Sequence, residues 1–397
     1  MIFWVGFIVF SIGSAMTSTF STGMIRLIQL FQGIGLLCIV YSTIRVIQFK
    51  VQNDFLKLML VLYFCWSLFV VFNGFLYDYT FFKRVLFQGI FKYFLPIIIL
   101  FPKNINFYKR TFDVIVILCV AYFVLNLVYL DIVLTHYDEN VNQKFTFEGF
   151  TKDLGVPAGF VLFTFIYHNK YRNTLALLVV VFIILVATYK ARRAVLALAT
   201  VQLVIFAVIF YIKSSKKLLI ILSGVVLLLL AIPLGKDLFM EHKDTFFDKV
   251  IERGAEDTRT GVELAFKRDF ETVDWIVGRG INGKYWCPNV DLNDTTGYRV
   301  MIETEYLNII LKGGLIHLGL ILIIILPAAF KALFYSRNLL SKAAGIWIVL
   351  WVLCLYPLNV FSFDMNYLLL WVCVSIGYSK DVRMMSDNTI KAAFSST

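Results

Sequence analysis

The sequence predicts an all-α polytopic membrane protein with about twelve transmembrane helices and one large outer loop between helices nine and ten. Of 397 residues, 60% are hydrophobic and only 16% are charged, whereas soluble domains carry about 25% charged residues. Mean hydropathy is +0.80, and apolar runs of spanning length recur along the chain. These observations exclude a soluble enzyme, a disordered tail and a single-pass receptor.

Each expected helix is an apolar run close to the length that crosses a bilayer. The runs divide the chain into helices one to nine within 1–235, a large periplasmic loop at 236–301, helices ten to twelve within 302–380 and a cytoplasmic tail at 381–397. No basic segment precedes the first run, so we expect it to be retained as a helix. The runs fall at 2–18, 27–46, 55–77, 85–101, 110–131, 156–168, 173–189, 194–212, 218–235, 313–335, 343–360 and 365–379.

The basic residues predict the orientation. Lys+Arg exceed Asp+Glu by 37 to 26, an excess that can indicate nucleic-acid binding. Here every second connection is basic, which is typical of cytoplasmic loops. We therefore expect both termini in the cytoplasm and no nucleic-acid partner. Representative residues are Arg45, Lys109, Arg172, Lys213, Arg337 and Lys380.

Three basic residues break this pattern. Lys190, Arg192 and Arg193 fall in a very short turn on the outer side, between the seventh and eighth runs. Cations at the hydrophobic boundary are costly, and arginine matches phosphate oxygens in a bidentate fork. The turn therefore favours a site for a diphosphate or a lipid headgroup. The alternative is that these side chains extend to outer-leaflet phosphates.

The fourth run carries charges inside the apolar region. Arg84, Gln88 and Lys92 recur at helical spacing on one face, and Lys92 lies about midway along the run. A lysine within a membrane helix indicates a functional site. Pairing of Lys92 with a buried asparagine, Asn73 or Asn126, is an equally weighted alternative.

The large loop contains a basic amphipathic helix, expected at 259–274, with Val262, Ala265, Phe266 and Phe270 on its apolar face. A turn-rich Gly278-to-Gly280 segment follows it. Most charges on such a helix belong to a solvated face, which is the alternative to anion binding. The basic residues of this region are Arg253, Arg259, Lys267, Arg268 and Arg279.

The end of the loop carries carboxylates. Glu303 and Glu305 precede the tenth run, and Gly313–Gly314 permits a bend there. A carboxylate beside arginines at the membrane boundary can act as a general base. The alternative is a salt bridge to Lys312 or to a loop arginine. No histidine pair or Asp-x-Asp spacing predicts a metal or another cofactor.

Three segments carry a resemblance to a known family. ATYKARRAVLALA, TRTGVELAFKRDFETVDWIVGRGI and ETEYLNIILKGGLIHLG resemble the arginine turn, the arginine-to-Gly-x-Gly segment and the late-helix signature of the O-antigen polymerase and O-antigen ligase superfamily. The likeness covers about residues 155–335. It assigns the family arginines to Arg192 or Arg193 and to Arg259, and the glycines to Gly278 and Gly280. Glu303 stands where many ligases have histidine, which favours a polymerase.

The resemblance implies a metal-independent, GT-C-like membrane glycosyltransferase of bacterial surface-polysaccharide assembly. Its expected partners are a polyprenyl-diphosphate-linked oligosaccharide, membrane lipids, a chain-length regulator and a flippase. We therefore expect a polysaccharide polymerase in the bacterial cytoplasmic (inner) membrane, with Glu303 or Glu305 as the general base. Tyr285, Trp286 and Tyr298 are the aromatic residues expected to stack on sugar rings. A ligase of the same fold and a lipid-linked oligosaccharide flippase are the alternatives. The residues expected to bind the diphosphate are Arg192, Arg193, Arg259, Lys190, Arg268 and Arg84.

Overall fold

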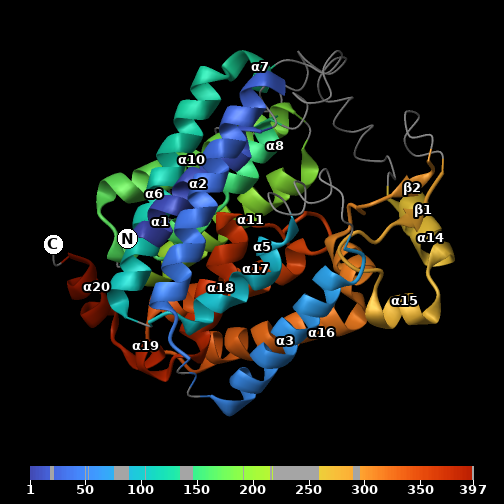
Figure 1. The fold of residues 1–397 in the computed structure, drawn as a ribbon. Coiled ribbons are helices and arrows are strands. Elements are labelled where there is room, and N and C mark those ends of the chain that lie inside the picture. Colours follow the sequence, from blue (N-terminus) through green and yellow to red (C-terminus); the bar gives the residue numbers. More distant parts are fainter. Residues whose placement is uncertain are drawn as a thin grey trace.

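The computed structural model describes residues 1–17, 22–49, 51, 53–75, 89–102, 104–134, 146–190, 192–214, 217, 259–288 and 296–395. Within these residues the chain is mostly helical, and its one hairpin pairs β1 (Tyr285–Trp286) with β2 (Tyr298–Arg299) (Figure 1). The all-α class predicted from the apolar runs is thus confirmed for the described part of the chain.

Six described helices are long and apolar enough to cross a membrane, judged by length and composition. In each of these helices, at most 50% of the residues in the most apolar stretch are buried inside the protein. Helices that are apolar on their outward faces too are typical of membrane proteins. These helices are α2 (Thr22–Val46), α3 (Asp54–Phe72), α6 (Ile105–Val128), α10 (Lys170–Tyr189), α11 (Arg193–Lys213) and α16 (Glu305–Phe334).

The other predicted runs have different outcomes, so the total of twelve spans remains a prediction. Four runs correspond to shorter apolar helices, and the ninth, 218–235, lies outside the described residues. The sixth run is irregular, with a π-helical and a 3-10 turn on either side of α9. The shorter helices are α1 (Ile2–Met16), α5 with η2 (Phe91–Leu100), α17 (Leu339–Cys354) and α18 (Met365–Tyr378). The sixth run contains α9 (Ala158–Phe163) and η5 (Phe165–Tyr167), and η4 (Thr151–Gly155) directly precedes it.

Both ends of the chain pack against the start of α6. The ring of Trp4 lies 5.3 Å from that of Phe107, and the ring of Phe394 lies 5.6 Å from that of Phe112. We call this end of the bundle the tail end, and the opposite end, which carries Glu305, the loop end. Figure 1 shows both termini on the same side of the ribbon. The two termini therefore share one end of the bundle.

Four of the helices that begin at the tail end start in the same way. An asparagine precedes each helix and accepts a hydrogen bond from the backbone N–H three residues later. Such a cap satisfies an N–H that the helix itself cannot pair and stabilises it by about 1 kcal/mol. These residues are Asn53, Asn104, Asn169 and Asn338, which cap α3, α6, α10 and α17.

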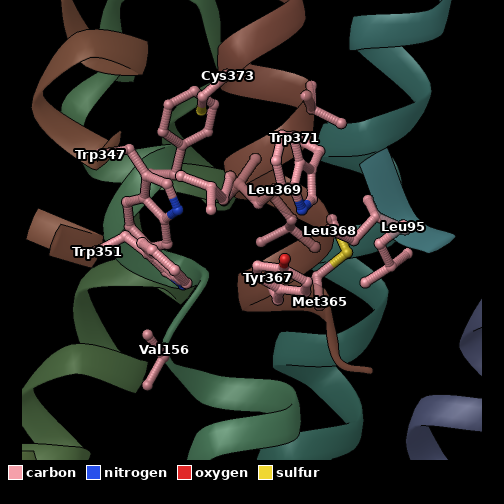
Figure 2. Packing of buried hydrophobic residues seen from close by; sticks show 14 of the residues in the cluster. Leu95, Val156, Trp347, Trp351, Met365, Tyr367, Leu368, Leu369, Trp371 and Cys373 are labelled. Carbon is pink, nitrogen blue, oxygen red and sulfur yellow. The ribbon is translucent and has the colours of Figure 1, made fainter. Parts of the chain in front are cut away.

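α18 is the central helix of the bundle. Every one of its residues from Met365 to Tyr378 is buried, and α16, α17 and η2 pack around it. Figure 2 shows Trp347 and Trp351 of α17 beside Tyr367 and Trp371 of α18. Because α18 touches protein on all sides, it fixes the positions of the elements that form the loop end.

The described part of the predicted large loop, 259–288 and 296–301, is called the loop segment below. The single helix expected at 259–274 is wrong, because the structure has α14 (Thr260–Asp269) and α15 (Thr272–Val277). Phe270 is extended, and Glu271 forms a capping box with Asp274 that starts the second helix. Val262, Phe266 and Phe270 are buried as predicted and pack with Tyr285.

The residues after α18 are folded onto the tail end. They form α19 (Lys380–Met384) and α20 (Asp387–Ser395). Asp387 accepts hydrogen bonds from Tyr167 Oη at 2.5 Å, the Leu339 amide at 2.7 Å and Lys213 Nζ at 2.9 Å. One carboxylate thereby ties the segment predicted as a tail to three other parts of the bundle.

Two further short helices, α7 (Leu130–Leu134) and α8 (Thr146–Phe150), lie at the loop end.

Candidate functional site

Of the two acids predicted as the general base, Glu305 is buried and Glu303 is exposed. Glu305 begins α16 and is only 1% exposed. Asn308 Nδ2 donates to Glu305 Oε1 at 3.2 Å. The Asn359 amide, turned so that its nitrogen faces the carboxylate, donates to Oε2 at 2.9 Å. Both donors are uncharged, so they orient the carboxylate without neutralising it.

Three charged groups act on Glu305. The positive charges of Lys92 and Lys152 attract it, and the negative charge of Asp364 repels it. Asp153 in turn interacts with Asp364 and Lys152. We call Lys92, Lys152, Asp153, Glu305 and Asp364 the buried charge cluster, in which the three carboxyls are buried and the two lysines are half-buried. Its members come from α5, η4, α16 and the N-terminal cap of α18, so only the folded bundle brings them together.

Asp153 and Asp364 act on each other inside the cluster. Burial first, and then the neighbouring Asp364 carboxylate, raise the pKa of Asp153. Burial likewise raises the pKa of Asp364, although Ser362 donates a hydrogen bond to it. Burial and the neighbouring carboxylate thus both favour the protonated form of these carboxyls relative to carboxyls in water.

Lys92 contacts aromatic rings. Its Nζ lies 4.7 Å from the centre of the Phe361 ring, a cation–π contact. Of the two asparagines considered as its partners, Asn126 bonds elsewhere: its Nδ2 donates to the Tyr122 carbonyl at 2.8 Å. The charged group that acts most strongly on Lys92 is therefore Glu305.

His317 packs among aromatic rings. Its imidazole packs against Tyr63, Tyr93 and Phe361, with ring centres 5.3 to 5.6 Å apart. Within the described part of the chain, neither ring nitrogen has a hydrogen-bond partner. Lys92 and His317 therefore contact the same two rings, those of Tyr93 and Phe361.

The basic turn lies at the loop end, between α10 and α11. Arg192 Nε and Glu148 Oε1 of α8 form an ion pair at 2.7 Å. Burial, and then the charge of Arg192, lower the pKa of Lys190, and Arg193 is exposed. Glu148 precedes Lys152 by one helical turn. The segment α8–η4 thus connects the basic turn to the buried charge cluster.

Arg259 anchors the loop segment to the bundle. Its two guanidinium nitrogens each donate at 3.0 Å, to the carbonyls of Tyr356 and Pro357. Nearby, Thr304 Oγ1 donates to Glu263 Oε1 of α14 at 2.6 Å. These contacts hold α14 against the residue that precedes Glu305. Arg259 therefore lies beside the candidate site, with its guanidinium on backbone carbonyls.

The remaining predicted residues are not members of the buried charge cluster. Arg268 is exposed on α14, and Arg84 lies outside the described residues. Gly278 and Gly280 flank a segment that packs onto α16: the Arg279 and Gly280 amides donate to the Leu311 and Lys312 carbonyls at 2.8 and 2.9 Å. The Gly-x-Gly pattern thus serves backbone packing in this structure.

Three members of the cluster were not among the predicted site residues. Lys152 and Asp153 lie in a polar stretch before a short apolar run, and Asp364 precedes the last run. Charged residues at the start of a membrane helix usually face water, so their burial leaves no mark in the sequence. An acid and a base side by side in TKDLGVP was the available signal.

The sequence offered Lys312 as a possible salt-bridge partner of the carboxylates that precede the tenth run. In the structure, its side chain donates hydrogen bonds to backbone carbonyls. Its Nζ donates to the Gly283 and Val300 carbonyls at 2.8 and 2.7 Å.

A cavity of about 480 Å³ lies at the tail end, lined by Gln48, Asn53, Tyr378 and Asp381 among others, and so is remote from Glu305. Within the described ranges, no three His, Cys, Asp or Glu side chains are grouped so that they could hold a metal ion. In comparisons with known proteins, no family model, no curated protein and no solved structure matches the chain.

Proposed function

We propose that the chain is a polysaccharide polymerase that joins polyprenyl-diphosphate-linked oligosaccharide repeat units at the outer face of the bacterial cytoplasmic membrane. The observation that carries this proposal is Glu305, a buried carboxylate held by two amides beside Lys92 and Lys152. A base and two cations at one site are what glycosyl transfer from a diphosphate requires when positive side chains stabilise the leaving group.

The proposed reaction uses each group once. Glu305 takes the proton from an acceptor sugar hydroxyl, whose oxygen attacks the anomeric carbon of the donor. The bond from that carbon to the diphosphate oxygen breaks, and its electron pair leaves with the polyprenyl diphosphate. Lys92 and Lys152 stabilise the negative charge that develops there. The basic turn of Lys190, Arg192 and Arg193 then holds the diphosphate at the membrane boundary.

The orientation belongs to the same proposal. Lys213, Arg337 and Arg383 lie at the tail end, where Lys213 pairs with Asp387 and the Arg383 carbonyl accepts from the Arg337 amide. Basic residues concentrate on the cytoplasmic side of membrane proteins. The tail end with both termini is accordingly cytoplasmic, twelve spans cross the membrane, and the loop end faces the periplasm.

The test is reconstitution of the purified protein in lipid nanodiscs with a synthetic polyprenyl-diphosphate-linked repeat unit. A polymerase converts it into a ladder of longer glycans on the carrier lipid. A ligase needs a separate lipid or protein acceptor and forms no ladder, and a flippase leaves the repeat unit unchanged. Absence of the ladder under conditions where the protein stays folded overturns the proposal.

A further inference from the structure

Two large aromatic side chains are exposed together on the hairpin. Trp286 is 45% and Tyr298 47% exposed, and their ring centres are 5.0 Å apart. They are direct cross-strand neighbours, as are Tyr285 and Arg299. Because side chains alternate along a strand, one face buries Tyr285 in the loop segment and the other presents the aromatic pair.

The position of the pair is fixed by the backbone. Gly297 has a positive φ of 65°, and a Cβ on it would lie 2.7 Å from the Trp286 ring. The indole therefore lies directly on the Gly297 backbone. The Cys287 amide also donates to the Gly297 carbonyl at 2.9 Å. The aromatic pair is consequently a preformed surface.

The hairpin is tied to the helix that carries Glu305. Lys312 Nζ donates to the Gly283 carbonyl before β1 and to the Val300 carbonyl after β2. Lys312 follows Glu305 by seven residues in α16, a rise of about 10 Å in an α-helix. β2 also leads directly into α16. One side chain thus clamps both arms of the hairpin at a fixed place relative to the buried charge cluster.

We infer that Trp286 and Tyr298 form a stacking platform for a pyranose ring of the acceptor glycan. This inference rests on the proposed function and adds the binding site of the second substrate. The C–H face of a pyranose is apolar and packs on an aromatic ring, while its hydroxyls remain at the ring edge for polar partners. Exposed Lys284 and Thr296 border the aromatic pair and supply such partners. Along the chain, β2 is followed within six residues by Glu305 at the start of α16.

The experiment compares Trp286→Ala and Tyr298→Ala with the conservative variants Trp286→Phe and Tyr298→Phe in the nanodisc assay. Val273→Ala, which removes another exposed apolar side chain of the loop segment, is the matched control. Loss of stacking raises KM for the acceptor by about tenfold, the equivalent of roughly 1.4 kcal/mol, and leaves kcat unchanged. The phenylalanine variants keep most of the affinity. Alanine variants with unaltered KM, or with a loss confined to kcat, overturn the inference.

A second measurement separates this inference from the proposed function. The probe is the oligosaccharide released by mild acid from synthetic lipid-linked repeat unit, titrated against tryptophan fluorescence of the whole protein. Saturable quenching that Trp286→Phe abolishes supports the platform even if no ladder forms in the nanodisc assay. Absence of Trp286-dependent quenching overturns it even where polymer is made. Quenching of Trp286 by brominated lipids in the nanodisc identifies a membrane anchor instead and likewise overturns the inference.

Discussion

Gly278 of the loop segment and Gly314 of α16 pack backbone against backbone. A Cβ on Gly278 would lie 2.5 Å from the Gly314 amide nitrogen, and a Cβ on Gly314 would lie 2.1 Å from the Ile276 carbonyl oxygen. Gly314 interrupts α16 with a φ of 68° and a ψ of −177°, values that are essentially confined to glycine. The break in α16 is therefore built to receive the loop segment.

Substitution of either glycine should loosen the loop segment. Gly314→Ala and Gly278→Ala combine a strained backbone with a steric clash, and each should cost about 1–3 kcal/mol. Thermal unfolding in detergent should show a midpoint lowered by several degrees. Gly319→Ala is the matched control in the same helix, because a Cβ there meets nothing within 4 Å. Equal midpoints for all three variants would contradict the packing argument.

Substitution of Glu305 and of Glu303 by glutamine should show which of the two acids is the general base. Glu305→Gln keeps the size and hydrogen-bonding capacity of the side chain but removes the base, so initial rates of glycan extension should fall by about 10²-fold or more. Glu303→Gln should retain activity within a few-fold, because Glu303 is exposed. Both proteins should elute as folded monodisperse particles. A greater loss in Glu303→Gln than in Glu305→Gln would move the base to Glu303.

The ion pair between Arg192 and Glu148 permits a test of the basic turn. If Arg192 binds the diphosphate, Arg192→Gln should lower the extension rate by about 10²-fold, the effect of removing one charge-stabilising donor. Glu148→Gln leaves the arginine charge in place and should change the rate by less than about tenfold. Equal losses would instead assign Arg192 a purely structural role. Arg193→Gln, measured in parallel, tests the second arginine of the turn.

The Asp387 contacts predict a pH dependence at the tail end. Burial alone would raise the pKa of Asp387, but hydrogen bonds from Tyr167, the Leu339 amide and Lys213 lower it overall. A lowered pKa stabilises the folded state above the ordinary value near 4, and this contribution disappears as pH falls through the folded-state value.

Thermal midpoints measured between pH 3 and pH 6, a range of about one to two units around that ordinary value, should therefore fall toward the acid end. Asp387→Asn should lower the midpoint at neutral pH and flatten the acid limb. Asp381→Asn, at an exposed residue of α19, is the control. An unchanged acid limb in Asp387→Asn would exclude Asp387 as its origin.

Sequence reasoning recovered the helices better than the site. The bend at Gly313–Gly314, the turn at Lys190 to Arg192 and the buried face of Val262, Phe266 and Phe270 were predictable, because each depends on residues close together in the chain. The break at Phe270 was missed, since the apolar spacing continues across it and only the Glu271–Asp274 capping box ends the first helix. Lys92 and Glu305 were each singled out, but nothing in the sequence connected them.

The sequence by itself determined the membrane class and the candidate acids and bases, because hydropathy and local spacing act within one helix or turn. Only the tertiary structure decided which of these charges meet. Packing around α18 brings η4, α5 and α16 together, and so places Lys152 and Lys92 beside Glu305 while leaving Glu303 exposed. The physical reason is that burial of a charge depends on long-range packing and on the partners that this packing supplies.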